Sequence, residues 1–157
     1  MAVELKAGDK APDFDLASDE GGDIRLADLK GRIVVLYFYP KDDTTGCTSE
    51  AIAFSGAKAD FDQIGAVVVG VSKDPVKSHG KFRNKHALTV RLAADPEGKV
   101  VESYGVWVEK SMYGRRYMGI ERATFLIDPQ GVIRRVWRKV SVTGHAAEVL
   151  AAARDLA

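Results

Sequence analysis

The chain has 157 residues, of which 46% are hydrophobic and 29% charged, and its formal net charge at pH 7 is +1. This composition is typical of a globular protein, and we expect a single domain over residues 1–157. The near-neutral charge argues against binding to nucleic acid or to an acidic membrane through bulk electrostatics. The longest apolar run, Ile33 to Tyr39, is far too short to cross a bilayer, and no apolar segment near the N-terminus resembles a signal peptide. A single cysteine suits the reducing cytoplasm.

Hydrophobic periodicity predicts strands that alternate with helices over much of the chain. Alternating residues between positions 13 and 28 predict an N-terminal hairpin, and continuous apolar runs predict buried strands over 32–39 and 66–71. Apolar residues at helical spacing predict one helix from Thr48 to Gly65. The remaining expected elements are a helix over 75–86, a short strand over 91–94, a helical turn ending at Tyr104, a hairpin of strands 123–127 and 132–137, and a closing helix over 144–156.

This order of elements predicts an α/β fold. Strands that alternate with helices and then end in an antiparallel pair indicate a three-layer domain with a mixed central sheet and an N-terminal hairpin. In such sheets the reactive site lies beyond the carboxyl ends of the parallel strands. Cys47 falls just past the end of strand 32–39, so we expect the site there.

Cys47 is the only cysteine, and it lies where a polar loop gives way to a predicted helix. The N-terminal end of a helix supplies free N–H donors and the positive end of its dipole, and both favour a thiolate. A lone cysteine excludes an internal disulfide, a CxxC redox pair and a cysteine-based zinc site. The scattered His79, His86 and His145 form no ligand set, so we expect neither a metal nor another cofactor.

The spacing Pro40-x-x-x-Thr44-x-x-Cys47 suits a thiolate that attacks an O–O bond. Pro40 fixes the backbone as the strand ends and can shield the sulfur from bulk water. The Thr44 hydroxyl can donate to the thiolate, or hold one peroxide oxygen while it accepts the peroxide proton. The site also needs a fixed positive charge. Arg122, one residue before strand 123–127, could supply it if that strand neighbours strand 32–39.

The loop over residues 37–51 resembles the active-site loop of the peroxiredoxins, whose pattern is Pro-x-x-x-Thr/Ser-x-x-Cys. Together with residues 119–128, it is similar to the bacterioferritin comigratory protein, or peroxiredoxin Q, subfamily. The resemblance covers almost the whole chain. It implies a thioredoxin-like fold and a thiol-dependent peroxidase that reduces hydrogen peroxide and organic hydroperoxides. In that family's terms, Cys47 would be the peroxidatic thiol, Thr44 and Arg122 its activators, and Pro40 its shield.

The chain departs from many of these relatives because it lacks a resolving cysteine. They carry one five residues after the first, where this chain has Ile52, and others carry one on the next helix, but residues 75–88 contain none. The resemblance therefore implies a one-cysteine member whose sulfenic acid is reduced by an external thiol: thioredoxin, glutaredoxin or a small thiol. We expect a monomer or a weak homodimer.

Other interpretations of the same residues stay open. A non-enzymatic thiol redox sensor or holdase would use the same cysteine, but it would react once instead of cycling. A disulfide reductase is disfavoured because the two-cysteine motif is missing. Trp107 and Tyr113 either wall the pocket or are ordinary aromatics. Glu50, in the first turn of the predicted helix, suits the dipole and could pair with an arginine.

Overall fold

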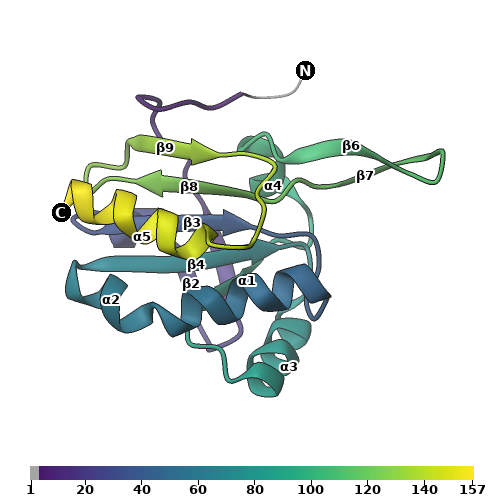
Figure 1. Cartoon of the computed structure of the whole chain (residues 1–157), viewed down its shortest axis with the longest axis horizontal. Coiled ribbons are helices and arrows are strands. Elements are labelled where there is room, and N and C mark those ends of the chain that lie inside the picture. Colours follow the sequence, from purple (N-terminus) through teal and green to yellow (C-terminus); the bar gives the residue numbers. More distant parts are fainter. Residues whose placement is uncertain (1–3) are drawn as a thin grey trace.

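The computed structural model describes residues 4–157. Its centre is a seven-stranded mixed sheet, in which three neighbouring parallel strands are flanked on both sides by antiparallel ones (Figure 1). The strand order is β2-β1-β5-β4-β3-β8-β9. The strands are β1 (Asp15–Ser18), β2 (Asp23–Arg25), β3 (Ile33–Phe38), β4 (Ala66–Ser72), β5 (Arg91–Ala94), β8 (Ala123–Ile127) and β9 (Ile133–Trp137).

The two central strands are buried on both faces, as their continuous apolar sequence predicts. Every residue of β3 and β4 is buried, and the two strands pair in parallel from Ile33 opposite Ala66 to Phe38 opposite Val71. Gly70 lies opposite Tyr37, and a Cβ at this glycine would come within 2.6 Å of the Tyr37 ring. The missing side chain at Gly70 therefore makes room for the large aromatic ring of Tyr37, which stacks on Phe54.

Helices cover both faces of the sheet and complete the three layers (Figure 1). One core lies between the sheet and the helices that contribute Phe54, Phe61, Phe82 and Val149. The other core includes Val101 and the short helical turn after β2. The helices are η1 (Leu26–Leu29), α1 (Thr45–Gly56), α2 (Lys58–Gln63), α3 (Val76–His86), α4 (Lys99–Ser103) and α5 (His145–Leu156). None of the helices in residues 4–157 is both long and apolar enough to span a membrane.

The prediction of one helix from Thr48 to Gly65 is wrong in two respects. The helix begins three residues earlier, at Thr45, and it breaks at Ala57 into α1 and α2. Gly56 weakens the helix at this point because glycine has low helix propensity. The N–H of Ala57 is shared between two carbonyls of the preceding turn, which ends α1. The earlier start matters for function, because it places Cys47 inside the first turn of a helix.

A third hairpin, in addition to β1–β2 and β8–β9, is not predicted by the sequence analysis. Strands β6 (Trp107–Met112) and β7 (Arg115–Ile120) form a separate two-stranded sheet that projects from the body of the protein (Figure 1). Its turn consists of Tyr113 and Gly114, both with positive φ, as a type I′ turn requires. Most of its side chains are exposed, so no run of apolar residues marks the strands. The signal that could have found them is the Tyr-Gly turn between two segments rich in β-forming residues.

Candidate active site

Sheet topology brings Cys47 and Arg122 together. Cys47 lies in the first turn of α1, just beyond the carboxyl end of β3. Strand β8 pairs antiparallel with β3, with Ala123 opposite Phe38. Arg122 directly precedes Ala123, so the strand pairing places it beside the end of β3. The adjacency on which the Arg122 prediction depended is therefore present.

The guanidinium of Arg122 joins Cys47 to Glu50. Its Nη2 donates a hydrogen bond to Cys47 Sγ at 3.4 Å, and its Nη1 donates to Glu50 Oε1 at 2.7 Å. Cys47 and Glu50 are each only 1% exposed and lie three residues apart, on the same face of α1. One rigid fork of donors thus contacts the thiol and a carboxylate at once, which a lysine could not reproduce.

Gly46 makes this approach possible. A Cβ at position 46 would lie 2.9 Å from Arg122 Nη2 and 3.7 Å from its Cζ. Real Cβ atoms do not tolerate the shorter distance, so any larger residue would push the guanidinium away from the sulfur. The glycine before Cys47 is explained by packing against Arg122.

Burial and charge act against each other at Glu50. Burial raises its pKa to about 7, although Arg122 works in the opposite direction. Burial also opposes the charge of Arg122, but Glu50 and Cys47 outweigh it and raise the pKa of the guanidinium. Glu50 Oε2 and the Tyr37 hydroxyl are buried without a hydrogen-bond partner among residues 4–157. The carboxyl thus changes protonation near neutral pH, while the guanidinium stays charged.

Thr44 and Pro40 lie at the entrance of this site. Thr44 is the N-cap residue of α1 and is exposed, and Pro40 is half-buried. The Thr44 hydroxyl donates to the carbonyl of Lys41 at 2.8 Å and makes no hydrogen bond to Cys47. With its proton used in this way, the oxygen of Thr44 has lone pairs that can accept a hydrogen bond from a substrate.

A buried network around Asp42 holds the loop between β3 and α1, and we call it the Asp42 anchor. The Asp42 carboxylate accepts hydrogen bonds from the Tyr39 hydroxyl at 2.6 Å, from Ser78 Oγ at 2.8 Å and from His79 Nδ1 at 2.7 Å. The other ring nitrogen of His79 donates to the Ala93 carbonyl at 3.0 Å. Both nitrogens of His79 face acceptors, an arrangement that favours the protonated ring. Burial opposes this charge, but Asp42 outweighs burial and raises the pKa of His79.

Three further contacts tie the loop to neighbouring elements. The N–H of Asp42 donates to Asp74 Oδ2 at 2.8 Å. Asp43, which has a positive φ, forms an ion pair with Lys85 at 2.7 Å and lies within hydrogen-bond distance of His86 Nε2, at 2.8 Å, on α3. Sequence reasoning missed this role, because Asp42 and Asp43 belong to the loop and their partners come more than 30 residues later. Only the fold brings them together.

Trp107 and Tyr113 do not wall the site. Tyr113 lies at the tip of the β6–β7 hairpin and is 98% exposed. Trp107 is half-buried and packs against the core opposite to Cys47, with Lys73 Nζ 4.1 Å from its ring centroid. Burial and then Arg122 lower the pKa of Lys110, on the same hairpin, and Cys47 and Glu121 act in the opposite direction. Within residues 4–157, no group of three potential metal ligands gathers.

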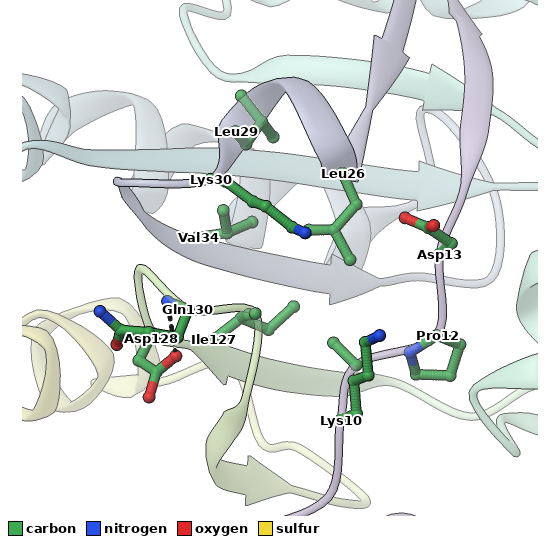
Figure 2. Close-up of a pocket in the computed structure, with 12 residues that line it drawn as sticks. Lys10, Pro12, Asp13, Leu26, Leu29, Lys30, Val34, Ile127, Asp128 and Gln130 are labelled. Atoms are coloured by element: carbon green, nitrogen blue, oxygen red, sulfur yellow. Dashed lines mark hydrogen bonds between the residues drawn. The ribbon is translucent and has the colours of Figure 1, made fainter.

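A cavity of about 310 Å³ lies away from these residues (Figure 2). Val34 and Ile127, which face each other near the start of β3, line it together with Lys10 and Lys30. Cys47 follows the opposite end of β3. This cavity therefore has no part in the chemistry of the thiol.

Comparison with known proteins supports a common origin for this arrangement. The AhpC/TSA family matches residues 7–136. The chain is 51% identical over 148 residues to a putative peroxiredoxin Bcp of Coxiella burnetii, covering 94% of this chain and 98% of that protein. It is 47% identical over 156 residues to peroxiredoxin Bcp of Bacillus subtilis, covering 99% of this chain and 98% of that protein.

Solved structures agree with the sequence relatives. A crystal structure of a Xylella fastidiosa peroxiredoxin Q mutant has a TM-score of 0.92 and 38% identity, and the match covers 98% of each chain. A Xanthomonas campestris bacterioferritin comigratory protein, solved in work on its alkyl peroxide reduction activity, has a TM-score of 0.88 and 39% identity, covering 99% of this chain and 98% of that one. The predicted thioredoxin-like α/β fold is confirmed. The chain belongs to the AhpC/TSA family and is a thiol-dependent peroxidase of the Bcp, or peroxiredoxin Q, group, with one cysteine.

Proposed function

We propose that the protein reduces hydrogen peroxide and organic hydroperoxides through a sulfenic acid on Cys47, which an external thiol then resolves. The observation that supports this best is the Arg122 fork, which contacts Cys47 Sγ at 3.4 Å and Glu50 at 2.7 Å. A half-buried cation fixed beside a sulfur favours the thiolate and can stabilise negative charge on a leaving oxygen.

In the first step, the Cys47 thiolate attacks the terminal oxygen of the hydroperoxide. An S–O bond forms, the O–O bond breaks, and the leaving alkoxide takes up a proton to become an alcohol. Arg122 stabilises the charge that develops on the departing oxygen. Thr44, whose own proton is held by the Lys41 carbonyl, accepts the hydrogen bond of the peroxide and orients it. Pro40 limits access of bulk water at the end of β3.

In the second step, a thiol from another molecule attacks the Cys47 sulfenic acid. No other cysteine exists in the chain, so an internal disulfide cannot form. An S–S bond forms, the S–O bond breaks and the oxygen leaves as water, which gives a mixed disulfide. A second thiol then attacks the sulfur of the donor, forms the external disulfide and releases Cys47 for another cycle. Because an external thiol reduces the sulfenic acid, no cysteine of a second subunit is needed, which is compatible with the expected monomer or weak homodimer. The reducing cytoplasm would keep the thiol donor reduced.

Steady turnover tests this function against a redox sensor or holdase. Peroxide consumption is followed with excess thiol present, for the parent protein and for Cys47→Ser. We expect many turnovers per chain for the parent and none for the variant. Intact mass after one equivalent of peroxide should show a sulfenic acid that dimedone traps. A single equivalent consumed, with no further turnover on addition of any thiol, would favour the sensor.

A further inference from the structure

The cavity of about 310 Å³ near the start of β3 has an apolar floor (Figure 2). Val34 and Ile127, which are 1% and 0% exposed, belong to the core on this face of the sheet. Leu26 and Leu29 of η1 line the same space and belong to the same core. Water gains few hydrogen bonds from such a floor, so filling the space with an apolar group is favourable.

Backbone hydrogen bonds hold the walls of this cavity together. The N–H of Ala11 donates to the Gly131 carbonyl at 2.9 Å, which ties the N-terminal segment to the turn between β8 and β9. The N–H of Gly31 donates to the Pro129 carbonyl at 2.9 Å, which ties the segment after η1 to the same turn. The fold thus sets the shape of the cavity, and a molecule can enter it without paying to order its walls.

Two exposed lysines line the cavity from opposite walls. Lys30 directly follows η1, Lys10 belongs to the N-terminal segment, and both side chains extend into the space between these walls (Figure 2). Among residues 4–157, no carboxylate lies within 4.0 Å of either ammonium group. Both positive charges are therefore available to an anion that enters the cavity.

The two aspartates at the cavity do not cancel this charge. Asp128 is 8% exposed, and its Oδ1 accepts hydrogen bonds from two backbone N–H groups at 2.9 and 3.0 Å. Its Oδ2 lies 3.5 Å from Arg134 Nη1, so a third cation balances its charge. Asp13 is exposed and offsets one lysine at most. The cavity therefore combines a net positive charge with an apolar floor, which is complementary to an amphipathic anion.

We propose that this cavity is a binding site for a small carboxylate with an aliphatic chain. The chain lies on Val34 and Ile127, and the carboxylate pairs with Lys10 and Lys30. At the packing density of protein interiors, a cavity of about 310 Å³ holds a chain of roughly eight to ten carbons with its carboxylate. Cys47 belongs to the core on the other face of the sheet and follows the opposite end of β3, so this site is separate from the peroxidase site.

Octanoate and octan-1-ol are a matched pair of probes, because they share one chain length and differ in charge. Their affinities are measured by titration of the amide chemical shifts at low ionic strength, for the parent, Lys10→Met and Lys30→Met. The titration also identifies the residues that each probe contacts. The quantity compared is the ratio of the two affinities, which cancels any general effect of a substitution on the apolar floor.

In the parent, octanoate should bind more tightly than octan-1-ol, and both should shift the signals of residues 10–13, 26–34 and 127–131. Each lysine substitution should lower the ratio about three-fold, in line with the loss of one partly exposed ion pair. Asp13→Asn should raise the ratio about two-fold, because it removes a repulsive charge. High salt should lower the ratio in the parent. Lys6→Met, an exposed lysine outside the cavity lining, is the matched control and should keep the parent ratio.

An unchanged ratio in folded Lys10→Met and Lys30→Met would overturn the anion site and leave the lysine stems as a cover for apolar surface. Shift changes centred on residues 40–47, or changes that do not saturate, would place octanoate elsewhere on the protein. Shift changes at the cavity when the concentration of the protein alone is raised would assign the cavity to a second copy of the chain. None of these measurements involves peroxide, so their outcome is independent of the proposed function.

Discussion

We predict that Glu50 makes the protein less stable as the pH rises from 5 to 8. Its pKa is about 7 in the folded protein, where the ordinary value is 4.5. The folded state therefore binds this proton more tightly than the unfolded state does. The stability that protonation of Glu50 confers is fully present at pH values below its pKa in the unfolded state. It is lost as the pH rises through its pKa in the folded state. At roughly 1.4 kcal/mol per pKa unit, the loss is about 3 kcal/mol.

Glu50→Gln isolates this contribution. The amide keeps an oxygen that can accept from Arg122, but it does not titrate. Relative to the parent, the variant should gain up to about 3 kcal/mol in the free energy of unfolding between pH 5 and pH 8. His79 adds to the slope of both proteins, since its raised pKa also gives stability that is lost as the pH rises. The difference between the two proteins removes that shared term.

Urea unfolding under reducing conditions, followed by tryptophan fluorescence at several pH values, measures the effect. Glu97→Gln, an exposed glutamate remote from the site, is the matched control and should follow the parent at every pH. A difference between Glu50→Gln and the parent that stays constant from pH 5 to pH 8 would refute the reasoning. It would mean that the carboxyl remains ionised throughout, held by Arg122 more strongly than burial opposes it.

Three further substitutions test the site, and a fourth, Gly56→Ala, is a matched control. Arg122→Lys should slow stopped-flow oxidation of Cys47 about a hundred-fold, because one mobile ammonium cannot replace the fork, and an unchanged rate would remove Arg122 from the mechanism. Gly46→Ala should slow the same step about ten-fold, because the new Cβ displaces the Arg122 guanidinium. Gly56→Ala is the control: its Cβ would meet open space, so the oxidation rate should stay unchanged. The helix should become more stable by up to about 1 kcal/mol. His79→Asn should cost about 3 kcal/mol of stability and speed hydrogen exchange in the active-site loop, and equal exchange in both proteins would contradict the anchor.

Local patterns predicted the buried framework of the fold well. Strands β3 and β4 are continuous apolar runs, and burial of both faces follows directly from that composition. The β6–β7 hairpin could not be found in this way, because its strands are mostly exposed and carry few core residues. The break at Ala57 was also missed, since Phe54 and Phe61 on either side of it both remain buried.

At the site, too, local patterns predicted some features and missed others. The position of Cys47 followed from a strand that ends and a helix that begins. Arg122 followed from the need for a fixed positive charge and from a family resemblance. The contacts of Glu50 with Arg122, and of Asp42 with His79, join residues 72 and 37 positions apart. The sequence does not distinguish a buried histidine from an exposed one. The two hydrogen-bond acceptors of His79 become apparent only in the folded structure. Contacts of this kind depend on strand order, which local periodicity does not determine.

The Asp42 anchor has a consequence for the temperature dependence of the reaction. It is complete before any peroxide arrives, so the loop does not lose conformational freedom when the substrate binds. Ordering a loop residue costs about 1–2 kcal/mol, and here that cost falls on folding instead of on the transition state. Oxidation of Cys47 should therefore show an entropy of activation that is only slightly negative for a bimolecular reaction. Removing His79 should make this entropy more negative.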